Sequence, residues 1–118
     1  MKQASRVLFV LAVALGTWMQ AFAGFKVGAA IVDISPVQFP VRIIGGVLSR
    51  TADKVRNPIH ARALVLDGGR ERVGIVVVDA CVLPRPLLDE VKTIVTQRTK
   101  MRSDRILISA THAHSVPA

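Results

Sequence analysis

The sequence predicts an α/β fold: a mixed sheet built from an N-terminal strand, a β-hairpin and a right-handed βαβ unit. Two runs rich in β-branched residues, at 72–78 and 105–110, are typical of strands in α/β sheets. The segment between them, 86–100, carries apolar residues at helical spacing. Such strand–helix–strand crossovers are almost always right-handed and leave the two strands parallel.

The first 23 residues predict a secretory signal peptide. Lys2 and Arg6 form a basic start, residues 7–15 are uninterrupted apolar sequence, and Ala21-Phe22-Ala23 is an A-x-A cleavage site. A membrane anchor is the alternative, but its apolar core would be short of the roughly 20 residues that a spanning helix needs. We therefore expect a secreted or periplasmic mature chain that begins at Gly24.

The charge balance favours a solvated basic face over a nucleic-acid site. The chain has 118 residues and a net charge of +8, and without Lys2 and Arg6 its 14 basic and 8 acidic residues give +6. These charges are scattered, and only Phe25 and Phe39 remain as aromatic residues after position 23, which leaves no stacking platform for bases. The surplus positive charge suits contact with an anionic membrane surface. We expect no nucleic-acid partner, and the oligomeric state stays open.

Residues 25–34 begin with alternating polarity and predict the first strand, which ends at Ser35-Pro36. Residues 38–57 show no sustained period and predict a long loop, a type of segment that is often functional. Within it, Gly45-Gly46 indicates close approach of the backbone to another group.

Residues 61–66 and 72–78 predict the two strands of a hairpin, joined by the turn Asp67-Gly-Gly-Arg70. The nearly all-apolar character of 72–78 predicts a central strand that is buried on both faces. In the helix at 86–100, Asp89-Glu90 near the start and Arg98 and Lys100 near the end match the helix dipole. Residues 105–110 predict a second buried strand.

Two histidines follow the last strand. The parallel strands should end at one edge of the sheet, at Asp79 and at Thr111-His112, and ligands of open α/β sheets bind at that edge. In an extended backbone, His112 and His114 point to the same side, and imidazole is a common metal ligand. The pair could be two metal ligands, half of an acid/base arrangement or two loop histidines.

Other polar residues have weaker patterns. Asp79 could bond an imidazole, ligate a metal or cap local backbone, and Ser115 could orient an imidazole. Asp33 is interpreted chiefly as a cap. His60 is interpreted as a surface or packing residue at the opposite end of its strand from the histidine pair. Cys81 ends an apolar run and is interpreted as a small packing residue, with a catalytic Cys–His pair as the alternative.

Four blocks of the chain together resemble the start of a neutral/alkaline (non-lysosomal) ceramidase. They are 25–36, 57–67, 76–79 and 104–115, the last containing S-A-T-H-A-H-S. The resemblance implies a secreted or membrane-associated zinc enzyme that hydrolyses N-acylsphingosine, a ceramide lipid, to sphingosine and a fatty acid. By position it implies that His112 is the first zinc ligand and that His114 contacts substrate or the developing oxyanion. The chemistry implied is attack of zinc-activated water on the amide carbonyl.

The chain departs from this family pattern in two ways. Ala113 stands where the family usually has Thr, and Val116-Pro117-Ala118 stands for Gly-Pro-Gly. The family takes a further His, Glu and Tyr ligand from downstream, and this chain has no tyrosine. We therefore expect residues 24–118 to be the N-terminal portion of a ceramidase-like catalytic domain, inactive alone. Another metallohydrolase of the amidohydrolase type and a small secreted, non-enzymatic binding domain are the alternatives.

Overall fold

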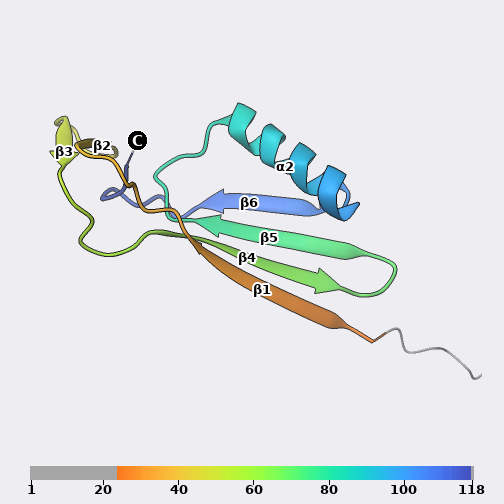
Figure 1. Cartoon of the computed structure of the whole chain (residues 1–118). Coiled ribbons are helices and arrows are strands. Elements are labelled where there is room, and N and C mark those ends of the chain that lie inside the picture. The colour runs from red at the N-terminus through yellow and green to blue at the C-terminus, as the bar shows by residue number, and fades with distance from the viewer. Residues whose placement is uncertain (1–23, 118) are drawn as a thin grey trace, which may run out of the picture.

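The computed structural model describes residues 24–117, so the predicted signal peptide at 1–23 lies outside the described residues. Four strands form one mixed sheet in the order β1-β4-β5-β6 (Figure 1). Its strands are β1 (Lys26–Asp33), β4 (His60–Asp67), β5 (Arg72–Val78) and β6 (Ile106–Ala110). β1, β4 and β5 pair antiparallel, and β5 and β6 pair parallel. The predicted α/β mixed sheet is confirmed, with its N-terminal strand, its hairpin and its strand–helix–strand unit.

The hairpin between β4 and β5 turns where the sequence predicts. The amide of Gly68 donates to the carbonyl of Glu71 at 3.0 Å, and the amide of Gly69 donates to Oδ1 of Asp67 at 2.8 Å. Gly69 has φ +85°, a left-handed conformation that glycine adopts without a steric penalty. The turn sets the register in which Asp67 lies opposite Arg72.

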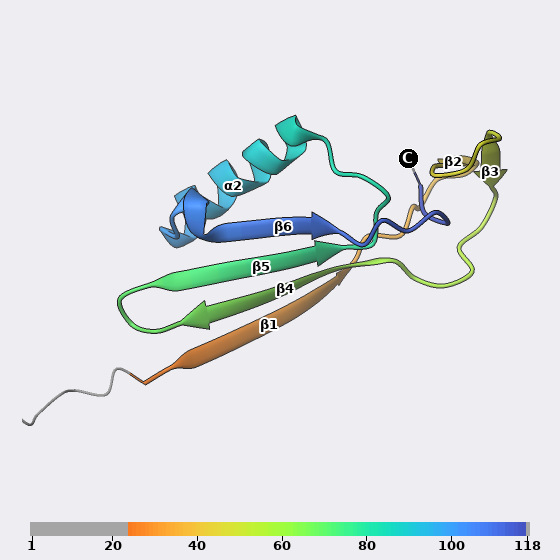
Figure 2. The same ribbon diagram turned by 180° about the vertical axis from the view of Figure 1, so that it is seen from behind.

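The helix α2 (Arg85–Thr99) connects β5 to β6 and runs beside β6 in both views (Figures 1 and 2). It begins after Pro84 and ends where Lys100 adopts φ +60°, with the Lys100 amide bonded to the Thr96 carbonyl at 3.0 Å. No acidic residue lies in its first turn, so the predicted dipole match at the N-terminus is wrong. Asp89 instead accepts a hydrogen bond from Nε of Arg85 at 2.8 Å.

A small core forms under the connection from α2 to β6, which includes the 3-10 turn η1 (Ser103–Arg105). Met101 and Ile106 are 6% and 5% exposed. The Met101 sulfur would lie 3.2 Å from a Cβ added to Gly74, so Met101 packs closely over the backbone of β5 and would have to shift slightly to admit a side chain there. Packing therefore concentrates on one face of the sheet, near β5 and β6.

The other face of the sheet is apolar and open in the described part of the chain. Val27, Ile31 and Leu107 lie on it by register and are 59%, 69% and 59% exposed. The prediction that 72–78 is buried on both faces is wrong, because only Gly74 of β5 is buried and no described element covers this side. For the same reason β6, predicted to be buried, has a half-exposed pattern.

The predicted loop at 38–57 contains two short strands, β2 (Val41–Ile43) and β3 (Arg50–Ala52), which pair antiparallel. Ile43 also forms an isolated bridge with Pro117, and the Ile44 amide donates to the Val116 carbonyl at 3.3 Å. The prediction of a long loop is therefore wrong for the residues of β2 and β3 and holds for the remainder of 38–57. Partners from the far end of the chain hold this segment next to the residues that follow β6.

Candidate metal centre

Two segments that follow parallel strands lie side by side at one edge of the sheet. The Thr111 amide donates to the Val78 carbonyl at 2.9 Å, and the Ala113 amide donates to the Ala80 carbonyl at 3.2 Å. These bonds extend the contact between β5 and β6 beyond the strands themselves. They bring Cys81 next to His112, although the two residues are 31 positions apart.

The backbone of Cys81 fixes the orientation of the His112 ring. Nδ1 of His112 lies 2.9 Å from the Cys81 carbonyl oxygen, which can only accept a hydrogen bond, so Nδ1 carries the hydrogen. In the neutral ring, Nε2 then keeps a free lone pair. Metal-binding histidines commonly hold their other ring nitrogen in this way, and the bond fixes the tautomer.

The His114 ring converges on the same point. Its Nε2 lies 3.3 Å from Nε2 of His112, and the ring planes meet at 74° with centroids 4.9 Å apart. The predicted convergence of the two imidazoles is confirmed, but the reason given for it is wrong. His112 has φ +58°, so the backbone between them is not extended.

The β2–β3 unit holds His114 from the other side. Nη2 of Arg50 donates to the His114 carbonyl at 3.1 Å. A Cβ on Gly45 would lie 2.6 Å from Cγ of the His114 ring, so the ring rests directly on the Gly45 backbone. The close approach predicted for Gly45-Gly46 is present, and the group that approaches is an imidazole of this chain.

Cys81 completes a group of three residues that could hold a metal ion. One ligand atom from each of Cys81, His112 and His114 lies within 4.8 Å of the others. The thiol is buried and its sulfur lies 3.9 Å from Nδ1 of His112, whereas both imidazoles are exposed. The predicted packing role of Cys81 is confirmed, since the residue is 6% exposed. Its position beside His112 was not predicted, although the strand–helix–strand unit places residues 79–81 beside 111–113.

The spacing of the two imidazoles fits a tetrahedral ion. Two nitrogens, each about 2.0–2.1 Å from a tetrahedral zinc, lie about 3.3 Å apart. The measured Nε2–Nε2 separation is 3.3 Å. A thiolate with its sulfur about 2.3 Å from the same zinc would lie about 3.5 Å from each nitrogen. The sulfur of Cys81 lies 3.9 Å from Nδ1 of His112, so the thiolate would have to move for all three residues to bind one ion through both Nε2 atoms.

Asp79 does not join this group. Its carboxylate accepts from Nη1 of Arg62 at 2.9 Å and from the His60 amide at 2.9 Å. The Arg62 bond, followed by the backbone bond, lowers the pKa of Asp79. Of the three roles considered for Asp79, capping of local backbone is the one its contacts support.

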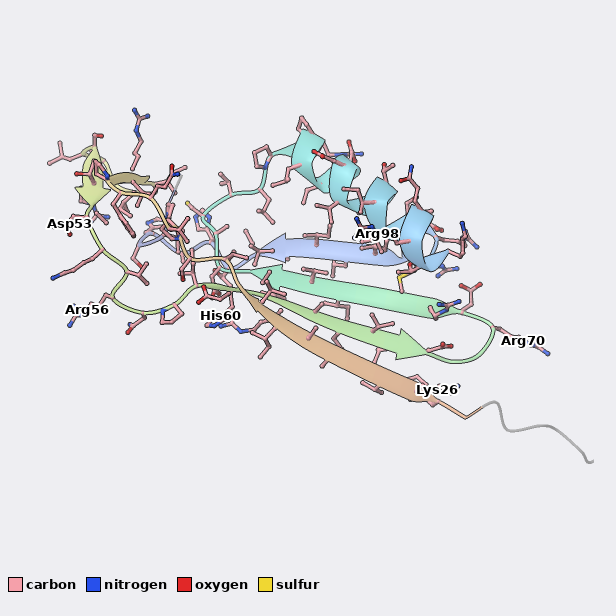
Figure 3. The ribbon with its side chains drawn as sticks, in the orientation of Figure 1. Lys26, Asp53, Arg56, His60, Arg70 and Arg98 are labelled. Atoms are coloured by element: carbon pink, nitrogen blue, oxygen red, sulfur yellow. The ribbon has the colours of Figure 1, made fainter. Side chains whose placement is uncertain are left out.

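The predicted position of His60 is wrong. Because β4 runs antiparallel to β5, His60 (labelled in Figure 3) lies at the end of the sheet where β5 ends. Its Nδ1 is 4.0 Å from the Asp79 carboxylate. Asp33 pairs with His60 at this edge, and its Oδ1 accepts from the Ser35 amide at 2.8 Å. The predicted capping role of Asp33 is confirmed. Hydrogen bonds to Ser35 lower the pKa of Asp33.

Ser115 has no hydrogen bond to either imidazole within residues 24–117, so the orienting role considered for its hydroxyl has no support there. It lies instead on the wall of a cavity beside the β2–β3 unit. Across the same residues, no helix is long and apolar enough to cross a membrane.

Comparison with known proteins adds no family assignment. No protein-family model matches the chain, and no curated protein matches it.

Proposed function

We propose that residues 24–118 are the N-terminal part of a secreted, zinc-dependent amidase that resembles the neutral ceramidases and hydrolyses N-acylsphingosine-like lipids. The observation that carries the proposal is the hydrogen bond between Nδ1 of His112 and the Cys81 carbonyl, which leaves Nε2 of His112 available to a metal, with Nε2 of His114 3.3 Å away. Both histidines belong to the block 104–115, which has the strongest family resemblance. The metal would be zinc because imidazole and thiolate are its usual ligands.

In this proposal the two imidazoles have different roles. His112 would ligate zinc through Nε2, since its Nδ1–H is held by the Cys81 carbonyl. Zinc at this position would polarise an amide carbonyl and acidify a water molecule.

Without metal, the Nε2–H of His114 donates to Nε2 of His112, because the latter carries no hydrogen. Once that lone pair binds a metal, the His114 hydrogen is free. It could then be donated to the oxygen of a substrate carbonyl, where negative charge develops.

Hydrolysis is proposed only for a longer protein that contains this chain and supplies further zinc ligands. The resembling family adds a His, a Glu and a Tyr, and this chain contains no tyrosine. A longer reading frame that encodes these three ligands downstream of codon 118 would support the amidase. For the chain alone, which lacks those ligands, we propose that Cys81, His112 and His114 together bind the metal without turnover.

A second candidate follows from Cys81. A Cys–His–His group within one short chain could serve a small secreted metal-binding protein without catalysis. Full metal affinity in the 118-residue chain, together with no amidase activity in any longer product, would favour this candidate.

The experiment is zinc titration of the 118-residue chain by calorimetry, comparing wild type with the His112→Ala and His60→Ala variants. We expect His112→Ala to abolish the binding isotherm and His60→Ala to preserve it, because His60 lies at the same edge but outside the group. Equal stoichiometry in all three proteins would overturn the ligand assignment. In the longer protein, hydrolysis of a fluorescent N-acylsphingosine that survives His112→Ala would overturn the amidase.

A further inference from the structure

A cavity of about 730 Å³ lies beside the metal centre, within the size range of about 300–1,000 Å³ that is typical of small-molecule sites. Three segments that are distant in sequence form its walls: the chain from Pro36 through β2, the chain from β3 to Ile59, and the chain from Ser115 to Pro117. In Figures 1 and 2 the C-terminal end lies next to β2 and β3, in agreement with the bridge between Ile43 and Pro117.

One part of the lining is apolar. Its larger hydrophobic side chains are Phe39, Val41, Ile43, Val55, Ile59 and Val116. Phe39 and Val55 remain 37% and 38% exposed, so an occupant could cover apolar surface that is now in water. At about 25 cal/mol per Å² of apolar surface covered, such a wall favours an alkyl chain.

The charged part of the lining is entirely cationic. Arg50, Lys54 and Arg56 line the cavity, and no aspartate or glutamate does. Asp53 lies in the same segment but outside the lining. In the part of the chain that is described, none of the three cations forms an ion pair, and Arg50 uses Nη2 to donate to the His114 carbonyl. Donors remain free for a carboxylate.

The cavity shares its backbone with the metal centre. Ser115 and Val116, which line it, directly follow His114, and Arg50 bonds to the His114 carbonyl. A molecule in the cavity would therefore lie against the same loop that carries the imidazoles. The metal centre and the cavity therefore share one wall, the loop from His112 to Val116, although neither histidine lines the cavity.

We propose that this cavity binds a fatty carboxylate, with its alkyl chain on the apolar wall and its head group held by Lys54, Arg56 and Arg50. Charge complementarity decides the occupant. A neutral lipid would gain no ion pair with the three cations, and a cationic amphiphile would be repelled. Binding requires neither a metal nor the proposed hydrolysis, although a fatty carboxylate is also the acid that hydrolysis of an N-acyl lipid releases.

The test is calorimetric titration of the full chain, treated with chelator to remove metal, with palmitate below its micellar concentration. The variant Lys54→Gln/Arg56→Gln removes two exposed charges outside the strands. Its matched control is Arg70→Gln/Arg98→Gln, which changes the net charge equally at the other end of the molecule from Arg56 (Figure 3). We expect about tenfold weaker binding in the first variant and unchanged binding in the control.

Three comparison ligands sharpen the result. The neutral monopalmitoylglycerol and the cationic hexadecyltrimethylammonium should bind more weakly than palmitate, and acetate should not bind detectably. Equal affinity for palmitate and the cationic amphiphile, or equal loss in both double variants, would overturn the proposal. Acetate that binds as tightly as palmitate would also overturn it, because the apolar wall would then contribute nothing. Palmitate binding that is unchanged in His112→Ala would show that the lipid site does not depend on the proposed zinc site.

Discussion

The His114 ring lies directly against the backbone of Gly45, so closely that a Cβ on Gly45 would lie 2.6 Å from Cγ of the ring. Gly45 has φ +91°, a region that side-chain-bearing residues rarely adopt. One glycine therefore satisfies two demands at once: it lets the β2–β3 connection turn, and it gives the imidazole room.

Gly45→Ala should displace His114 and weaken metal binding. The positive φ alone costs about 1–2 kcal/mol for a residue with a Cβ, and the contact with the ring adds to it. The matched control is Gly28→Ala, because a Cβ there would meet no atom within 4 Å. We expect zinc affinity, measured by calorimetry, to fall only in the first variant. Equal affinities would show that the His114 ring is free to move away.

Cys81→Ala tests the thiol apart from the backbone. The variant keeps the carbonyl that holds Nδ1 of His112, so the imidazole should keep its orientation. If the sulfur ligates, the thiolate-to-metal charge-transfer absorption of the cobalt(II)-loaded protein should disappear, and metal affinity should fall about tenfold or more. If the cobalt(II)-loaded wild-type protein shows no such absorption, the sulfur of Cys81 is not a ligand and only its carbonyl contributes, through the contact with His112. Val82→Ala, next in sequence and 57% exposed, is the control.

The ion pair between Arg62 and Asp79 makes stability depend on pH. The folded state lowers the pKa of Asp79 below the ordinary value of 3.8, chiefly through the Arg62 hydrogen bond. The stabilisation is therefore complete above the ordinary pKa and is lost as the pH falls through the lowered pKa. Arg62→Ala should raise the pKa of Asp79, which carboxyl NMR titration measures, and reduce the acid-dependent loss of stability. The effect should be about 1 kcal/mol or less, since the pair is partly exposed.

Arg42→Ala is the control for this titration, because Arg42 lies on β2 and forms no ion pair within residues 24–117. If the pKa of Asp79 stays low in Arg62→Ala, the main cause of the lowered pKa would be the His60 amide, which donates to the same carboxylate.

Met101→Ala should be among the most destabilising single changes in the sheet domain. Met101 is 6% exposed and fills the space above Gly74, so truncation leaves a cavity that costs about 2–5 kcal/mol. Leu107→Ala, on the open face and 59% exposed, should change the free energy of unfolding by about 0.5 kcal/mol or less. Urea denaturation of the two variants measures the difference. A large loss in Leu107→Ala would indicate that a partner covers the open face.

The sequence predicted those elements whose signal is local. The apolar run at 72–78, the turn Asp67-Gly-Gly-Arg70 and the helical spacing after Pro86 each lie within a short window, and all three elements form. The convergence of His112 and His114 was also predicted, since the two residues are close in the chain, but the extended backbone expected between them does not form.

The errors concern contacts between distant segments. β2 and β3 are three residues each, and partners near residue 117 hold them in place, so no local period shows them. Cys81 meets His112 only through the parallel pairing of β5 with β6. The position of His60 could have been inferred, since the antiparallel hairpin brings the start of β4 to the end of β5.

The hydrogen bond from Arg50 to His114 joins residues 64 positions apart. Closing a loop of that size costs conformational entropy before any contact compensates for it. The wall shared by the metal centre and the cavity should therefore be among the last parts of the molecule to assemble and among the first to open in local fluctuations, as amide hydrogen exchange would report. A metal ion or a fatty carboxylate that binds only the closed form would make that opening rarer, so binding and local folding of this wall are thermodynamically linked.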